Sequence, residues 1–148
     1  MTQLPHPFPA YKLPINKSLI KFYIYGSHEC CRCRRLLQFL SETYGNDSIV
    51  FYEISNGTNN TIVSKGFLVD YPEMGYLPIT GIAYNGTLVA IVSGYNLPYD
   101  VEGLIKIALQ YRVLVIKDPS GKIHYVGSAE KRAALEEVFL YNRLPSGS

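Results

Sequence analysis

The residues of this chain best suited to chemistry are its three cysteines, at positions 30, 31 and 33. A structural disulfide stabilises a fold mainly by closing a long loop, whereas a Cys30–Cys33 bridge closes about four residues and contributes only roughly 2 kcal/mol. The cluster therefore makes a poor structural crosslink. Its position in one short segment, with no cysteine elsewhere, indicates chemistry instead.

Spacing selects two of the three thiols as a reactive pair. Residues 31–44 have apolar side chains at helical spacing, and residues three apart lie on one helix face. Cys30 and Cys33 are therefore within reach of a disulfide, whereas Cys31 and Cys33 point apart and a vicinal Cys30–Cys31 bridge would be strained. We expect Cys30 to be the attacking thiolate and Cys33 the resolving thiol. Cys31 is either a spectator or a competing resolving thiol.

The surroundings of Cys30 favour the thiolate form. This residue falls where a loop becomes a helix, and the unpaired backbone N–H groups and the helix dipole favour negative charge there. Arg32, Arg34 and Arg35 add cations, and such surroundings bring cysteine pKa values down to roughly 3.5–7.5. Arg32 is a candidate for binding an anionic substrate group, and Arg34 for tuning the thiol. A solvated helix start is the alternative interpretation of all three arginines.

The two residues that precede Cys30 are further candidates for tuning. His28 could shuttle protons or adjust the thiol of Cys30. Glu29 could act as a base for Cys33, or raise the pKa of Cys30 by like charge. The alternative for both is an exposed loop residue without a role in the chemistry.

Metal binding and simple burial are the alternatives to redox chemistry at the cysteines. Zinc normally takes a second pair of ligands at a distance in the sequence. His28 lies too close to complete an easy tetrahedral set, and only His6 and His124 lie elsewhere. We therefore expect no metal. A free cysteine can also be an inert residue of the core.

Composition narrows the class of protein. The chain has 148 residues, of which 47% are hydrophobic and 18% charged, and this suits a globular domain with one core. Its net charge of +2 gives no reason to expect nucleic acid or a membrane as partner. No apolar run approaches the roughly 18 residues of a membrane span, and segment 1–17 lacks the apolar core of a signal peptide. We expect a cytoplasmic protein.

Hydrophobic periodicity predicts the order of the elements. We expect an extended arm over 1–17, a domain over 18–111, and a ββα extension packed on it over 112–148. The predicted strands are 18–25, 49–54, 79–84, 87–92, 113–117 and 123–126. The predicted helices are 31–44, 59–70, 98–111 and one that Ser128 caps. Asn85-Gly86 predicts a two-residue hairpin turn, and Pro98 predicts the start of a helix.

The connections between the strands predict the sheet. Strands joined by a helical crossover run parallel, whereas the strands of a hairpin run antiparallel. The domain over 18–111 is therefore predicted to be α/β, with a mixed four-stranded sheet and helices on both faces. The hairpin within 112–148 could extend the sheet, cover an edge or form a dimer contact. The sequence leaves the oligomeric state open.

Two segments carry a resemblance to a known superfamily. Residues 25–35 (YGSHECCRCRR) resemble the active-site segment of glutaredoxins, where a strand runs into a Cys-Pro-Tyr-Cys motif followed by a basic residue. The segment Leu77-Pro78-Ile79-Thr80, followed by the Asn-Gly turn and Gly94, resembles the second landmark of thioredoxin-like proteins. The resemblance covers about residues 18–110. It departs from the family pattern at Cys31 and Arg32, which replace the usual proline and tyrosine.

The resemblance implies a thioredoxin-like fold and a thiol–disulfide oxidoreductase of the glutaredoxin/thioredoxin type, with a redox-active Cys30–Cys33 disulfide in its CxxC motif. It also implies that Pro78 is a cis-proline packed against the pair, and that the backbone of Leu77 pairs with the substrate. The expected partner is a disulfide-containing protein or glutathione, with no bound cofactor and glutathione as a candidate reductant. Two alternatives stay open. One is a non-catalytic thioredoxin-like module that binds a protein, and the other is a metal or iron–sulfur carrier that uses the cysteine cluster.

Overall fold

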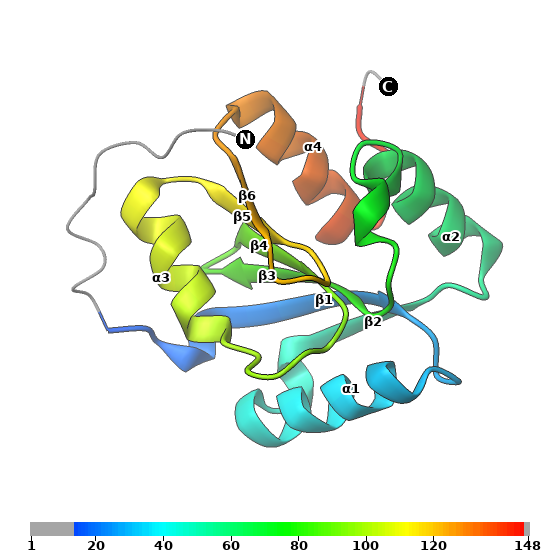
Figure 1. Ribbon diagram of the computed structural model, residues 1–148, viewed down its shortest axis with the longest axis horizontal. Helices are drawn as coiled ribbons and strands as arrows, with labels where there is room; N and C mark the ends of the chain where they lie inside the picture. Colours follow the sequence, from blue (N-terminus) through cyan, green and yellow to red (C-terminus); the bar gives the residue numbers. More distant parts are fainter. Residues whose placement is uncertain (1–13, 147–148) are drawn as a thin grey trace.

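The chain folds around one continuous six-stranded sheet with helices on both faces (Figure 1). The computed structural model describes residues 14–146, so most of the predicted arm over 1–17 lies outside the described residues. The strands are β1 (Ile20–Gly26), β2 (Ile49–Glu53), β3 (Ile79–Tyr84), β4 (Thr87–Ser93), β5 (Leu114–Lys117) and β6 (Ile123–Val126). Their order across the sheet is β2-β1-β3-β4-β5-β6.

This sheet corrects the sequence-based fold class. We predicted a thioredoxin-like fold with a four-stranded mixed sheet, and the prediction is wrong because β5 and β6 belong to the same sheet. β1 pairs parallel with β2 and antiparallel with β3, which pairs antiparallel with β4. β4 then pairs parallel with β5, and β5 antiparallel with β6. An open β4 edge would present unpaired backbone groups, and β5 satisfies them.

The helices form one layer on each side of the sheet (Figure 1). They are α1 (Cys31–Tyr44), α2 (Gly57–Val63), which a π-helical turn continues over Ser64–Leu68, α3 (Val101–Tyr111) and α4 (Ala129–Phe139). α1 and α3 share a core with Phe22 and Ile24 of β1. α2 and α4 share the opposite core with Tyr25. Within residues 14–146, no helix combines the length and apolar character needed to cross a membrane.

Two local structures, a hairpin turn and a helix cap, form where the sequence predicted them. Asn85 and Gly86 have φ angles of 53° and 83°, the left-handed conformation that a two-residue hairpin turn requires. Ser128 is the N-cap of α4, and its hydroxyl accepts a hydrogen bond from the backbone N–H of Lys131 at 3.3 Å. These short-range contacts are formed by neighbouring residues, so the sequence alone is enough to predict them.

The start of α3 differs from the prediction. The helix begins at Val101 rather than at Pro98, and Asp100 is its N-cap. The Asp100 carboxylate accepts a hydrogen bond from the backbone N–H of Gly103 at 3.0 Å. A carboxylate at this position satisfies a donor of the first helical turn, whereas a proline side chain carries no acceptor. The stronger cap therefore sets the boundary.

The last helix is tied to the middle of the sheet. The hydroxyl of Tyr25 lies 2.6 Å from the carbonyl oxygen of Val138. Phe139 packs directly on the backbone of Gly81 in β3, where an added Cβ would lie 2.8 Å from the ring. α4 therefore needs a glycine beneath it, and it completes the core on the α2 side of the sheet.

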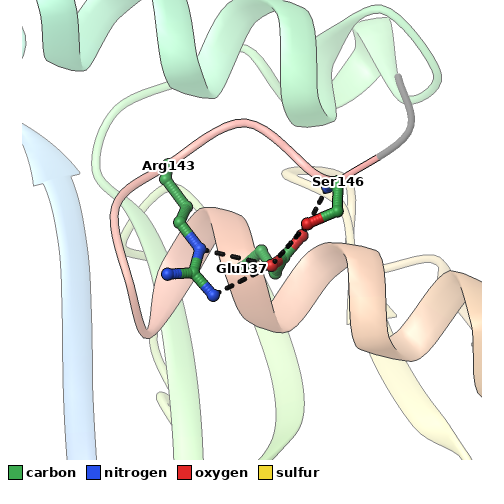
Figure 2. A network of polar contacts seen from close by, with 3 residues as sticks. All are labelled: Glu137, Arg143 and Ser146. Carbon is green, nitrogen blue, oxygen red and sulfur yellow. Dashed lines mark hydrogen bonds and ion pairs between the residues drawn. The ribbon is translucent and has the colours of Figure 1, made fainter.

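The segment that follows α4 folds back onto Glu137 (Figure 2). One carboxylate oxygen, Oε1, accepts hydrogen bonds from Nε and Nη2 of Arg143 at 3.2 and 3.0 Å. The other, Oε2, accepts from the backbone N–H of Ser146 at 2.6 Å. These bonds, the one from Ser146 first, hold the pKa of Glu137 below its usual range. One ionised side chain thus fixes the path of the chain beyond the helix.

Candidate active site

Cys30 and Cys33 lie together where β1 leads into α1. Cys30 is the N-cap of α1, and its Sγ accepts a hydrogen bond from the backbone N–H of Cys33 at 3.4 Å. The helix covers the predicted residues, 31–44. Its geometry brings residues 30 and 33 to the same end, as the spacing indicated.

The three thiols differ in exposure. Cys33 is completely buried, Cys30 is partly exposed and Cys31 is exposed. A substrate can therefore reach Cys30, while Cys33 lies behind it in the protein. Cys31 and Cys33 face different surroundings, as the sequence analysis expected.

The structure favours the thiolate of Cys30. Partial burial raises the pKa of this thiol, but hydrogen bonds from Cys33 and from the backbone of Arg32, together with the Arg32 charge, outweigh that effect. The pKa of Cys30 is therefore lowered from its ordinary value. The donors are the thiol of Cys33 and the free N–H groups of the first helical turn, which commonly stabilise an anion.

The structure disfavours the thiolate of Cys33. Burial, as the largest cause, raises the pKa of Cys33 to about 12, although a hydrogen bond from the backbone of Ser27 opposes this effect. The nearby Cys30 and the carboxylate of Glu53 raise the pKa further. The two thiols of the CxxC motif are thus driven in opposite directions, one toward the anion and the other toward the neutral thiol.

Gly26 allows this packing. An added Cβ at this last residue of β1 would lie 2.9 Å from Sγ of Cys33 and 3.2 Å from the ring of Phe51. The sulfur of Cys33 therefore rests directly on the backbone of the strand. Any side chain at position 26 would have to displace the sulfur or the ring.

The loop before Cys30 is held by contacts that the sequence did not reveal. The backbone N–H of His28 donates to Oε1 of Glu53 at 3.0 Å, and Nη1 of Arg34 donates to the carbonyl oxygen of His28 at 2.7 Å. The His28 ring lies against Phe51, with 4.5 Å between the ring centroids. Arg34 thus braces the loop, a contact that we had not predicted for it.

The remaining candidates near the motif are exposed. Glu29 donates its backbone N–H to the hydroxyl of Ser27 at 3.2 Å, and its side chain is exposed. Arg32 lowers the pKa of Cys30 through its charge and its backbone N–H, and its side chain is exposed. Arg35 is also exposed.

The Leu77-Pro78 segment lies at the same end of the sheet. The peptide bond between the two residues is cis, as the resemblance implied. Tyr25 pairs with Ile79, so the next register position places the buried Pro78 opposite Gly26, on which Cys33 rests. Pro78 in turn accepts a hydrogen bond from the backbone N–H of Gly94 at 2.8 Å.

Leu77 has backbone groups available for a partner. Within residues 14–146, neither its N–H nor its carbonyl oxygen has a hydrogen-bond partner. The chain before it is fixed by Ser93, whose hydroxyl lies 2.8 and 2.9 Å from the carbonyl oxygens of Met74 and Tyr76. An unpaired backbone at the same end of the sheet as Cys30 is suited to pairing with an extended peptide.

Sequence reasoning missed Glu53, Phe51 and Ser93. Glu53 and Ser93 are the last residues of β2 and β4, where a polar side chain can reach the loops of the site, and Phe51 lies in the middle of β2. The available signal was the parallel pairing of the first two strands, which places their carboxyl ends at one edge of the sheet. Comparison with protein-family models, with curated proteins and with solved structures found no match to this chain.

Proposed function

We propose that this protein is a thiol–disulfide oxidoreductase that exchanges a Cys30–Cys33 dithiol with disulfide substrates. One observation carries the proposal: an accessible thiol with a lowered pKa accepts a hydrogen bond from the residue that bears a second, buried thiol. This asymmetry is what sequential disulfide exchange needs, because one sulfur must attack while the other keeps its proton.

In the first step the Cys30 thiolate attacks one sulfur of a substrate disulfide. A bond forms between Cys30 and that sulfur, the substrate S–S bond breaks, and the other substrate sulfur leaves as a thiolate that takes up a proton. The backbone N–H of Cys33 and the charge of Arg32 stabilise the attacking anion. The product is a mixed disulfide at the accessible position.

In the second step Cys33 loses its proton and attacks Sγ of Cys30. The Cys30–Cys33 bond forms, the mixed disulfide breaks, and the second substrate thiolate leaves. The first step has by then removed the negative charge from Cys30, one of the groups that raises the pKa of Cys33. In total, the protein dithiol loses two electrons and the substrate gains them. The reverse sequence oxidises a substrate dithiol.

The substrate is proposed to be a disulfide-containing protein or glutathione. The unpaired backbone of Leu77 supports an extended peptide lying beside Cys30. We propose no bound cofactor, and a cytoplasmic location where small thiols recycle the disulfide. The burial of Cys33 and the exposure of Cys31 favour a two-sulfur exchange site over a metal site that uses all three sulfurs.

The test is a disulfide-reduction assay on the wild type and three single variants, with a dithiol and then glutathione as reductant. We expect Cys30→Ser to be inactive, Cys33→Ser to accumulate a mixed disulfide at Cys30, and Cys31→Ser to retain most of the activity. Mass spectrometry identifies the trapped adduct. Full activity in Cys30→Ser would overturn the proposal, and activity with glutathione alone would support the glutaredoxin-type substrate.

A further inference from the structure

Glu53 lies beside the buried thiol by strand register. Gly26 and Glu53 are partners in the parallel β1–β2 pair, and side chains at paired positions leave a sheet on the same face. The Cβ direction of Gly26 points at Cys33, since an atom placed there would lie 2.9 Å from its Sγ. The Glu53 side chain therefore leaves the neighbouring strand, about 5 Å from β1, on the face of the sheet where the sulfur of Cys33 lies.

The Glu53 carboxylate also holds the loop that leads to Cys30. Its Oε1 accepts from the backbone N–H of His28 at 3.0 Å, and its Oε2 accepts from the backbone N–H of Ser55 at 3.3 Å. The backbone of Glu53 is itself fixed, because its carbonyl oxygen accepts from Nδ2 of Asn59 at 3.0 Å. The loop is thus attached to a rigid strand end through one carboxylate.

We propose that Glu53 is a positioning residue of the dithiol: its carboxylate fixes the loop before Cys30 and places a negative charge on the face of the sheet where Cys33 lies. This inference rests on the proposed function for its role in catalysis. The contacts that carry it are independent of any substrate.

The charges around this position decide the sign of the effect. α1 contributes Cys33, Arg32 and Arg34, of which Arg34 contacts the His28 carbonyl oxygen. The loop contributes His28, Glu29 and the N-cap residue Cys30. The hydrogen bond from His28 is the largest cause that lowers the pKa of Glu53, so the carboxylate is ionised at neutral pH. Its charge is one cause of the raised pKa of Cys33. Removing the charge should therefore ease ionisation of Cys33.

Two variants separate the charge from the hydrogen bond. Glu53→Gln removes the charge and keeps an oxygen that can accept from His28, whereas Glu53→Ala removes both. Glu42→Gln, an exposed change on α1, is the control. Each protein is reduced, and the thiol of Cys33 is titrated by NMR of ¹³Cβ-labelled cysteine, while amide hydrogen exchange is measured at His28.

We expect Glu53→Gln to lower the titration midpoint of Cys33, because a nearby like charge disfavours the thiolate. Glu53→Ala should in addition speed amide exchange at His28 by at least about tenfold, as expected when roughly 1.4 kcal/mol of local protection is lost. Glu42→Gln should change none of these values.

An unchanged Cys33 midpoint in Glu53→Gln, or unchanged His28 exchange in Glu53→Ala, would overturn the inference. Neither measurement needs turnover. A protein that shows both shifts but reduces no disulfide would leave the placement of Glu53 standing and overturn the proposed function instead. A protein that reduces disulfides but shows neither shift would leave the proposed function standing and overturn the inference about Glu53.

Discussion

The hydroxyl of Tyr25, one residue before the end of β1, lies 2.6 Å from the carbonyl oxygen of Val138 in α4. It also lies 2.8 Å from Oδ1 of Asn142, whose Nδ2 donates to Oδ1 of Asn59 at 2.9 Å. Asn59 in turn donates to the carbonyl oxygen of Glu53 at 3.0 Å. A chain of polar contacts thus links the last helix to the two strand ends that carry the cysteine site.

Removing the Tyr25 hydroxyl tests how much its contact with α4 contributes to the stability of the fold. Tyr25→Phe leaves the carbonyl oxygen of Val138 without its buried donor, so we expect the free energy of unfolding to fall by about 1–3 kcal/mol. Urea denaturation measures the change. Tyr141→Phe is the matched control, because Tyr141 is 60% exposed and its substitution should change stability by no more than about 0.5 kcal/mol. Equal losses in both variants would contradict this interpretation.

The pH dependence of alkylation tests the asymmetry of the two thiols. Because the pKa of Cys30 is lowered, its thiolate should form, and iodoacetamide should modify it, at a pH below that of an ordinary cysteine. The pKa of Cys33 is raised to about 12, so this thiol should stay unmodified over the same range. Peptide mapping by mass spectrometry gives the rate at each cysteine.

Arg32 should contribute to that asymmetry through its charge. Since the charge lowers the pKa of Cys30, Arg32→Ala should move the alkylation midpoint of Cys30 to higher pH. Arg35→Ala is the control, because this exposed arginine is not among the groups that lower the pKa of Cys30. A midpoint that moves equally in both variants would show a general effect of net charge.

Close packing at Gly26 makes it intolerant of any side chain. In Gly26→Ala the new methyl group would lie 2.9 Å from Sγ of Cys33 and 3.2 Å from the Phe51 ring, and both belong to short or rigid side chains. We expect a loss of roughly 1–3 kcal/mol in unfolding free energy and greater exposure of Cys33 to alkylation. Gly127→Ala should be neutral, because nothing lies within 4 Å of the added atom.

Glu137 should make stability depend on pH in the acid range. The pKa of this carboxyl is lowered by its hydrogen bonds from Ser146 and Arg143. Its contribution to stability is therefore complete above the ordinary carboxyl pKa and is lost as the pH falls through the lowered value. The wild type should lose its advantage over Glu137→Gln on acidification below about pH 4.5, whereas Glu130→Gln should track the wild type. Denaturation curves at a series of pH values measure this.

Local features of the fold were predictable from sequence where neighbouring residues determine them. The helix over 31–44, the Asn85-Gly86 turn and the Ser128 cap depend on residues within a few positions of each other. The start of α3 was misplaced because Pro98 and Asp100 are both favourable near a helix start, and only the carboxylate makes a capping bond.

Features that depend on distant pairing were not predictable. From the sequence, the hairpin formed by β5 and β6 could extend the sheet, cover an edge or form a dimer contact. The structure shows that it extends the sheet to six strands, through the parallel pairing of β4 with β5 at Ala90 and Val115. The same limit hid Glu53, which sequence alone shows as one polar residue near the end of a strand. Its place in the site becomes clear only from its strand pairing with Gly26, a residue far earlier in the chain.

The position of α4 in the chain has a consequence for synthesis on the ribosome. Domains generally begin to fold from the N-terminus as the chain emerges, and Ala129–Phe139 follows all six strands. Until that helix appears, the apolar surface around Tyr25 and Gly81 is left open by a nascent chain whose cysteines have already been made. A ribosome stalled before residue 129 would therefore present an unfinished sheet whose apolar face is open to other nascent chains.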